Sequence, residues 1–335
     1  MIRIAVDAMG GDDAPAVPVA AAALALKTLP EDVVIQLVGQ SAAIEGEMAR
    51  QAVAKSPRIV IVEAPEVVGM GEKPLQAIRS KRNSSIAVGL GAQKAGQSDA
   101  FISAGNTGAV MAASTLILKL YPGFERPAIG TPFPTYDKAV LVLDAGANVD
   151  CSAQELLGFA RLGVQYARDI YGRPNPAVGL LNIGEEAEKG NAAAKEAHRL
   201  LSESGLAFVG NVEGRDILRG KCEKGPFDVV VCDGFVGNVL LKFYESVAQL
   251  FHRLVDRELG ADVAGGAGMK KIWQVLDYAQ YGGAPLLGVM GVSIISHGRS
   301  SPEALRSAIK VAADAVRNGL VQHMAKEFQV EAAAR

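Results

Sequence analysis

Short segments of small and polar residues follow seven apolar runs along the chain. They begin at Asp7, Ser103, Asp144, Asn182, Asn211, Asp233 and Ser296. Such segments expose backbone N–H groups and carry hydroxyl, amide and carboxyl side chains of little bulk, so they can bind an anion or the oxygen of a carbonyl group. We therefore predict an enzyme whose substrates are small and resemble phosphate or carry a carbonyl group.

Three of these segments have the composition of phosphate-binding turns between a strand and a helix. Their sequences are SAGNTGA from Ser103, DGFVGN from Asp233 and SHGRS from Ser296. Free N–H groups and the positive end of a helix dipole would face an anion there. A tight turn without a ligand explains one such segment equally well, whereas three of them favour an anion site. The predicted phosphate ligands are Asn106, Thr107, Gly108, Gly237, His297 and Ser300.

Lysine and arginine side chains near these segments could supply positive charge. Lys189 lies near the end of the segment NIGEEAEKG, and a lysine ammonium is a compact point charge for a phosphate or an oxyanion. An isolated loop lysine is usually only solvated, but its position after a strand favours a functional role. The stretch KPLQAIRSKRNSS contains a second basic group, which could receive a phosphorylated ligand: Arg79, Lys81 and Arg82.

Several other site classes are excluded by spacing. GLGAQKAG at residues 89–96 has Lys94 where a dinucleotide-binding turn needs its third glycine, and it falls within an expected helix. GRDILRGKC at residues 214–222 is one residue too long for a nucleotide-binding P-loop and ends in Cys222 instead of Ser or Thr. No His or Cys pair has metal-ligand spacing. We expect no metal and no cofactor.

Composition bounds the class of protein. The 335 residues are 49% hydrophobic and only 5% aromatic, which suits buried parallel strands and alanine-rich helices. A net charge of −2 gives no bulk attraction to nucleic acid. Three cysteines without a C-x-x-C pair are typical of reduced thiols, and no leader peptide or apolar run of about 20 residues is evident. We expect a soluble cytoplasmic protein.

Strand and helix patterns alternate along most of the chain, and they must position these residues. Strands are expected at 2–7, 33–38, 58–63, 100–103, 128–134 and 138–144, and helices at 15–29, 42–54, 74–95 in two pieces, 107–118 and 152–171. In an open parallel sheet, ligands bind beyond the carboxyl ends of the strands. The fold class is therefore α/β with a mostly parallel sheet, and the strand ends should form one large anion-binding cleft.

The second half of the chain departs from this alternation. Helices at 238–260 and 269–279, separated by the glycine-rich GADVAGGAG, predict a helical hairpin insertion over residues 238–280. One terminal helix is expected at 301–328, with Pro302 in its first turn. We see no linker and no internal repeat. Residues 1–335 are therefore expected to form a single unit with two lobes.

Taken together, these motifs resemble the bacterial acyl-ACP:phosphate acyltransferases of phospholipid synthesis, where ACP is acyl carrier protein. The likeness runs nearly from end to end and departs from the family pattern at no motif. It rests on DAMGGD, KPLQAIRSKRNSS, SAGNTGA, LDAGANVD, LLNIGEEAEKG, NVEGRDI, CDGFVGNVLLK, YGGAPLLG and ISHGRS. The resemblance implies a two-lobed Rossmann-like fold similar to phosphate acetyltransferases and to isocitrate and isopropylmalate dehydrogenases.

The resemblance also implies a reaction, in which a long-chain acyl group moves from an ACP thioester to inorganic phosphate and forms an acyl phosphate. Phosphate is already an anionic nucleophile, so the enzyme must mainly position it and stabilise the tetrahedral oxyanion. The resemblance points most strongly to Lys189 for charge stabilisation and to Asn238 for binding phosphate or the oxyanion. Asn106, Thr107 and His297 would complete the pocket.

The resemblance implies partners as well: ACP, a second copy of the chain, the inner face of the cell membrane and a membrane-bound glycerol-3-phosphate acyltransferase. Acidic ACP should meet Arg79, Lys81 and Arg82, or basic residues of the hairpin, namely Arg253, Arg257, Lys270 and Lys271. The hairpin tip could contact lipid or pack in a dimer. Alternatives are a CoA-dependent enzyme for short acyl groups, a decarboxylating dehydrogenase and a non-enzymatic scaffold of lipid synthesis.

Overall fold

The computed structural model describes residues 1–136, 138–276 and 282–334. The chain divides into two compact units. Unit 1 comprises residues 1–127, 169–172 and 282–335, and unit 2 comprises residues 128–168 and 173–281. The expectation of a single functional domain with two lobes stays a prediction.

Unit 1 is built on a mostly parallel sheet. Its strands follow the order β3 (Ile59–Glu63), β2 (Val33–Gly39), β1 (Ile2–Asp7), β4 (Ala100–Ser103), β13 (Val292–Ile295) and β12 (Ala284–Leu287). Only β12 is antiparallel to its neighbour β13. Strands β1 and β4 are buried almost throughout, as expected for parallel strands covered on both faces.

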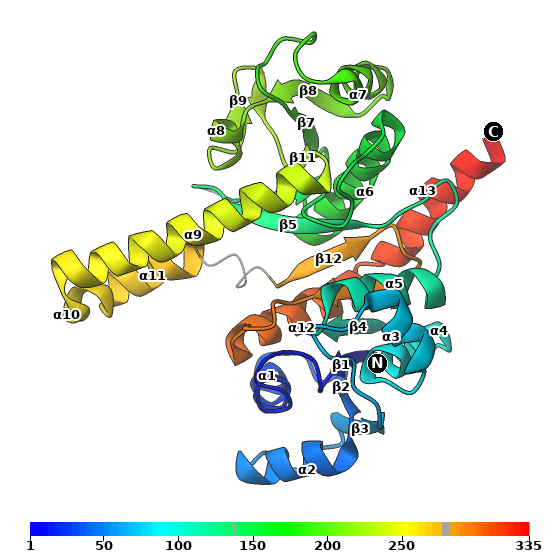
Figure 1. Ribbon diagram of the computed structural model, residues 1–335, viewed down its shortest axis with the longest axis vertical. Coiled ribbons are helices and arrows are strands. Elements are labelled where there is room, and N and C mark those ends of the chain that lie inside the picture. The colour runs from blue at the N-terminus through cyan, green and yellow to red at the C-terminus, as the bar shows by residue number, and fades with distance from the viewer. Residues whose placement is uncertain (137, 277–281, 335) are drawn as a thin grey trace. The chain divides into compact units, whose positions relative to one another are not determined.

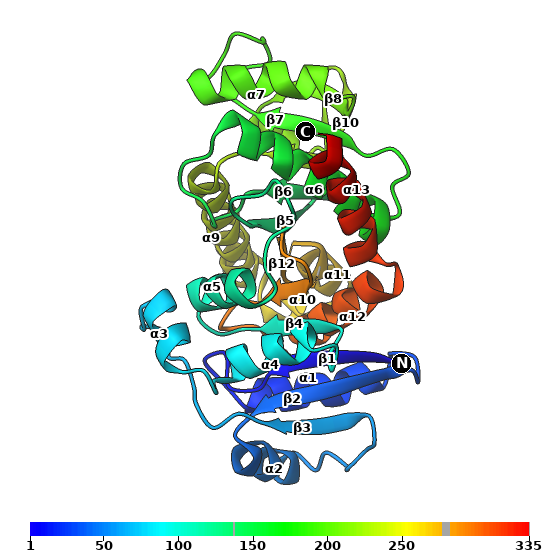
Figure 2. The same ribbon diagram turned by 90° about the vertical axis from the view of Figure 1, so that its right-hand side faces the viewer.

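Helices cover both faces of this sheet. Figure 1 shows α1 (Ala16–Leu26) and α12 (Pro302–Arg317) against one face, with α4 (Ser85–Lys94) and α5 (Thr107–Ile117) against the other. Figure 2 shows α2 (Ser41–Arg50) beside β3 at the end of the sheet. The near-fingerprint GLGAQKAG falls in α4, because Gly89 and Gly91 are helical. This placement confirms that it is no dinucleotide-binding turn.

Unit 2 contains the strand order β5 (Ala128–Pro134), β6 (Ala139–Leu143), β11 (Val229–Val231), β7 (Ala177–Leu181) and β8 (Ala207–Val212). Strand β5 is antiparallel to β6 and the others are parallel. The remaining elements are α6 (Ala153–Tyr171), whose last residues group with unit 1, α7 (Ala192–Glu203), α8 (Gly214–Ile217) and the ribbon of β9 (Lys221–Cys222) and β10 (Gly225–Pro226).

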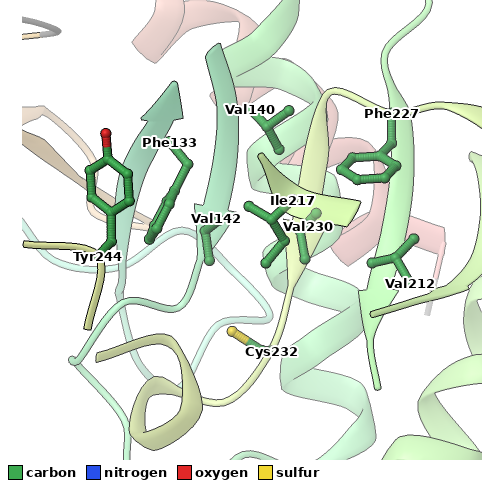
Figure 3. Packing of buried hydrophobic residues seen from close by; sticks show 9 residues of the cluster. All are labelled: Phe133, Val140, Val142, Val212, Ile217, Phe227, Val230, Cys232 and Tyr244. Atoms are coloured by element: carbon green, nitrogen blue, oxygen red, sulfur yellow. The ribbon is translucent and has the colours of Figure 1, made fainter. Parts of the chain in front are cut away.

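The core of unit 2 follows from the alternation of side chains along its strands. Gly163 of α6 packs on Leu143 and Val229. Val142 and Val230 each lie one residue further along their strands than Leu141 and Val229, so they point to the opposite face of the sheet. There they belong to a second cluster with Phe133, Phe227 and Tyr244 (Figure 3). The sheet is thus packed on both faces, and the two units confirm the predicted mostly parallel α/β class.

The hairpin consists of α9 (Gly234–Leu259), α10 (Ala261–Ala264) and α11 (Ala267–Leu276), and Figure 1 shows α9 and α11 running side by side. Trp273 of α11 holds it together, because its ring packs against Phe251 and stacks on His252 while Nε1 donates to the carbonyl of Ala264. Residues 277–280 of the predicted hairpin lie outside the described residues. Among the described helices, none is long and apolar enough to cross a bilayer.

Several predicted helix boundaries were wrong. Helix α1 ends at Leu26 and not at residue 29, and α2 ends at Arg50 and not at residue 54. Helix α9 begins at Gly234 and not at Asn238, because Asp233 caps it by accepting a hydrogen bond from the amide of Val236. The terminal helix is broken into α12 and α13 (Leu320–Ala334). Gly319 adopts a positive φ of 71° at the break, which ends the helical path there.

Candidate active site

Three neighbouring parallel strands of unit 2 end at the same edge of its sheet. Strands β6, β11 and β7 run side by side in one direction. Their carboxyl ends lead into residues 144–148, which we call the Asp144 loop, into the start of α9, and into residues 182–190, which we call the Lys189 loop. The sheet order therefore brings the segments of both predicted catalytic residues, Asn238 and Lys189, to one edge.

Asp144 is fully buried at this edge, and its carboxylate is saturated with donors. Oδ1 accepts from the amides of Ile129 at 3.0 Å and Ala147 at 3.1 Å. Oδ2 accepts from the backbone amide of Asn148 at 2.7 Å and from its Nδ2 at 2.9 Å. Burial raises the pKa of the Asp144 carboxyl, and these four hydrogen bonds oppose the rise.

Asn238 is the fifth residue of α9 and is exposed. Its side chain borders Gly146, since a Cβ placed on that glycine would lie 3.4 Å from Cβ and 3.5 Å from Oδ1 of Asn238. Gly237, the predicted ligand beside it, is buried because α9 packs directly onto the carbonyl of Asp144. Asn238 thus presents its amide beside the helix N-terminus, where donors for an anion gather.

Lys189 is available at the same edge. Its side chain is 46% exposed and has one carboxylate close by, Oε2 of Glu186 at 4.0 Å. An exposed pair at that distance is weak, so the ammonium keeps its capacity to attract an anion. The aliphatic stem of Lys189 covers Gly184, where an added Cβ would lie 3.2 Å from Cγ.

Two asparagines shape the Lys189 loop. Nδ2 of Asn182 donates to the carbonyl of Lys189 at 3.1 Å, and Nδ2 of Asn211 donates to the carbonyl of Glu186 at 2.6 Å. Gly190 has a φ of +90° and packs against the Asn182 side chain. The strand-end amides found in the sequence therefore organise the loop instead of facing solvent. Neither asparagine is among the predicted site residues.

Unit 1 contains a second edge of the same kind. Strands β1, β4 and β13 are parallel neighbours. Oγ of Ser103 donates to Oδ2 of buried Asp7 at 2.6 Å and accepts from the amide of Gly105 at 3.0 Å. Burial raises the pKa of the Asp7 carboxyl, and hydrogen bonds from Ser103 and Ser85 oppose the rise. The expected single cleft stays a prediction.

Asn106 turns out to be engaged in structure. Its Oδ1 caps α5 by accepting from the amide of Ala109 at 3.0 Å. Its Nδ2 lies within hydrogen-bond distance of the carbonyls of Gly69, Met70 and Glu72. These contacts occupy the side chain, whereas the amides of Thr107 and Gly108 have no acceptor within the helix. The role of Asn106 as a phosphate ligand stays a prediction.

The segment after β13 holds the remaining predicted ligands. His297 is exposed, and its Nδ1 accepts a hydrogen bond from the amide of Arg299 at 3.1 Å. The amide of half-buried Ser300 donates to the carbonyl of His297 at 2.9 Å. His297 therefore uses Nδ1 to close its own turn, and Nε2 is the nitrogen left for a ligand.

The three basic residues at the end of α3 (Pro74–Ser80) and just after it have different roles. Nζ of Lys81 donates to the carbonyl of Val67 at 2.7 Å and to Oε1 of Glu72 at 2.6 Å. The hydrogen bond from Lys81 lowers the pKa of Glu72. Arg79 and Arg82 are exposed. Lys81 thus holds its own loop, and the two arginines are the groups that face outward.

Comparison with known proteins identifies the family. Residues 2–323 match the model of a family described as fatty acid synthesis protein. The chain is 46% identical over 340 residues to a phosphate acyltransferase of Nostoc punctiforme, covering 98% of this chain and 97% of that one. It is 47% identical to a phosphate acyltransferase of Desulfitobacterium hafniense, covering 98% of both. The chain belongs to the phosphate acyltransferase family.

The fold agrees with this membership. A phosphotransacetylase from Streptococcus pyogenes superposes with a TM-score of 0.64 over 94% of both chains, at 19% sequence identity. At that identity the likeness shows the fold alone, and it confirms the predicted resemblance to phosphate acetyltransferases. The chain is thus an enzyme of the acyltransferase class, a phosphate acyltransferase of lipid synthesis.

Proposed function

We propose that this phosphate acyltransferase moves a long-chain fatty acyl group from an acyl-ACP thioester to inorganic phosphate and releases acyl phosphate and free ACP. The observation that carries the proposal is the arrangement at the unit 2 edge. The exposed ammonium of Lys189 and the amide of Asn238 follow adjacent strands there, in a family of phosphate acyltransferases.

The chemistry needs little more than charge and position. An oxygen of phosphate attacks the thioester carbonyl and forms a C–O bond, the C–S bond of the tetrahedral intermediate then breaks, and the leaving thiolate takes up a proton. Because a thiol has a pKa of about 8.5, the thiolate leaves without a strong acid. Lys189 stabilises negative charge on the intermediate, and Asn238 donates to phosphate or to the oxyanion.

A further set of phosphate-binding groups is proposed in unit 1. The free amides of Thr107 and Gly108 at the start of α5, Nε2 of His297 and the hydroxyl of Ser300 are the donors we assign. Gly108 has no room for a side chain, since a Cβ would lie 2.6 Å from Cγ of Pro74. A Gly108→Ala enzyme should therefore show a raised KM for phosphate.

Substrate class is tested by trapping acyl phosphate with hydroxylamine. The purified chain is supplied with inorganic phosphate and with palmitoyl-ACP, palmitoyl-CoA or acetyl-CoA in separate reactions. Turnover confined to palmitoyl-ACP is the expected result. Turnover with acetyl-CoA alone would assign the chain to short-acyl, CoA-dependent chemistry, and ACP binding without turnover would indicate a scaffold.

The catalytic assignment is tested by Lys189→Ala. Loss of the charge that stabilises the oxyanion should lower kcat by about 10²- to 10³-fold. Lys195→Ala removes an exposed lysine from the first turn of α7, close in sequence, and is the matched control. Full turnover by a folded Lys189→Ala protein would remove Lys189 from the mechanism.

ACP recognition is assigned to exposed basic side chains. Arg79 and Arg82 face outward, as do Arg253, Lys270 and Lys271 on the hairpin. Arg79→Glu with Arg82→Glu should raise KM for palmitoyl-ACP without changing KM for phosphate, because ACP is acidic. An unchanged KM, with a rise instead for Arg253→Glu with Lys270→Glu, would move the ACP surface to the hairpin.

We assign membrane contact to the tip of the hairpin, where Leu259 and Val263 are 56% and 49% exposed. Such contact would deliver acyl phosphate to a membrane-bound acyltransferase acting on glycerol 3-phosphate. Leu259→Asp with Val263→Asp should abolish sedimentation with anionic vesicles while preserving a dimer by light scattering. Preserved sedimentation would reject membrane contact, and a monomer would assign the tip to the interface between two copies.

A further inference from the structure

Hydrogen bonds occupy the acceptor positions of the Asp144 carboxylate. Four N–H groups, from Ile129, Ala147 and twice from Asn148, occupy both of its carboxylate oxygens at 2.7–3.1 Å. A carboxylate offers about four acceptor positions, so this one is filled. It can neither take a proton from a substrate nor bind a cation without losing a hydrogen bond. Its contribution must pass through the groups that it holds.

The first turn of α9 rests directly on these groups. The amide of Gly234 donates to the carbonyl of Asn148 at 2.7 Å. A Cβ on Gly234 would lie 2.7 Å from Oδ2 of Asp144, and one on Gly237 would overlap the carbonyl of Asp144. Only glycine allows so close an approach of helix and loop. The Asp144 loop therefore determines where α9 begins.

The same loop borders the amide of Asn238. Gly146 has a φ of +126°, and a Cβ on it would lie 3.4–3.5 Å from Cβ, Cγ and Oδ1 of Asn238. The backbone on which Gly146 lies is held by the hydrogen bonds from Ala147 and Asn148 to Asp144. Movement of this backbone would shift the start of α9, which carries Asn238, and would also change the surroundings of the Asn238 side chain.

We propose that Asp144 is the positioning residue for Asn238, which it fixes through the Asp144 loop and the glycines at the start of α9. The inference rests on the proposed catalytic role of Asn238. Replacing the carboxylate by a carboxamide leaves one acceptor oxygen and turns an NH₂ group toward N–H donors. The loop then relaxes, and the Asn238 amide moves by a fraction of an ångström, enough to weaken catalysis.

The test is a double-mutant cycle on the full chain with inorganic phosphate and palmitoyl-ACP. Asp144→Asn should lower kcat by about 10- to 100-fold and change KM for palmitoyl-ACP by less than about threefold. In an Asn238→Ala background the same substitution should lower kcat by less than about twofold further, because the residue it positions is gone. Equal losses of kcat in both backgrounds, or no loss in the single variant, would overturn the proposal.

Two further variants separate positioning from stability. Gly179→Ala destabilises unit 2 elsewhere, since its Cβ would lie 2.6 Å from Cγ1 of Val212, and should leave kcat per folded molecule unchanged. If Asp144→Asn does not fold, Asn148→Ala removes one donor and should lower kcat about 3- to 10-fold in the same cycle. Full activity of Asn238→Ala would refute the role of Asn238 itself and Asp144 with it. An inactive Asn238→Ala beside a fully active Asp144→Asn would refute the positioning alone.

Discussion

The hydroxyl of Ser103 donates a 2.6 Å hydrogen bond to Oδ2 of Asp7, a residue 96 positions earlier in the chain. The two residues end the neighbouring strands β4 and β1. The same hydroxyl accepts from the amide of Gly105, so one buried contact ties both strand ends to the turn before α5. A side chain at Gly10 cannot fit there, because its Cβ would lie 2.5 Å from Asp7.

Ser103→Ala should destabilise unit 1. The substitution removes one hydrogen bond to the buried carboxyl of Asp7 and leaves the amide of Gly105 without its side-chain acceptor, which costs about 1.5–3 kcal/mol. Urea unfolding followed by circular dichroism measures the loss. Ser246→Ala removes an exposed hydroxyl that bonds only the preceding helical turn, and should change stability by less than about 0.5 kcal/mol. Equal stability of the two variants would contradict the role of the Ser103 contact.

Asp7→Asn should change how stability depends on pH. Burial raises the pKa of Asp7 above the ~3.9 of an unfolded aspartate, so ionisation is disfavoured in the folded state. The contribution of the Asp7 carboxyl to the free energy of unfolding is therefore fully present below the unfolded-state pKa. It is lost as the pH rises through the pKa of Asp7 in the folded state. The free energy of unfolding of wild type minus variant should therefore fall over this window and then level off.

Asp32→Asn provides the contrast, because a hydrogen bond from Arg317 lowers the pKa of Asp32. The contribution of the Asp32 carboxylate to the free energy of unfolding is present above its pKa in the unfolded state. It is lost as the pH falls through its pKa in the folded state. The free energy of unfolding of wild type minus that of Asp32→Asn should therefore change with pH in the opposite direction. Urea unfolding at a series of pH values measures both, and slopes of the same sign would refute the assignment.

Two glycines on α4 should respond oppositely to alanine. A Cβ on Gly89 would lie 2.5 Å from Cε2 of buried Phe101, so Gly89→Ala should cost about 1–3 kcal/mol. Gly91, two residues on, has nothing within 4 Å of an added Cβ, and Gly91→Ala should stabilise the helix by about 0.5–1 kcal/mol. Thermal unfolding of both variants checks the sign, and a stabilising Gly89→Ala would be inconsistent with this packing.

Cys151 should resist alkylation despite its position close to the candidate site in unit 2. Burial raises the pKa of its thiol to about 12, and nearby carboxylates add to the rise. Iodoacetamide near neutral pH should then label it on the order of 10³-fold more slowly than free cysteine, because only the thiolate reacts. Peptide mass spectrometry follows the labelling, with urea-unfolded protein as the control. Labelling at the rate of free cysteine would exclude a raised pKa.

Features encoded within a few neighbouring residues were predicted correctly. The start of the helix predicted at residues 152–171 is an example, because Oγ of Ser152 accepts from the amide of Glu155, whose carboxylate accepts from the amide of Ser152. The two-piece helix at residues 74–95 and the strands predicted at 128–134 and 138–144 are confirmed as well. Each depends on capping, periodicity or turn residues that lie close together in the chain.

The missed roles depended on distant residues. Gly234 and Gly237 at the start of α9 lie against Asp144, about 90 positions before them. Lys81 was expected to meet a ligand, yet it bonds the backbone of Val67 and the carboxylate of Glu72. Asp7 and Asp144 were visible only as polar residues after strands, since nothing in their neighbourhood predicts complete burial.

From the sequence alone the α/β class and the polar segments that end the strands could be predicted, because apolar runs and small polar turns are local signals. The resemblance of its motifs to a known family pointed to Lys189 and Asn238 as the residues to test. The tertiary structure set which strand ends are neighbours. Strand β11 inserts between β6 and β7, so the segments of Asn238 and Lys189 meet one edge. It also decided which carboxyls are buried and saturated with donors. Strand order and burial arise from contacts between residues far apart in the chain, and no local pattern encodes those contacts.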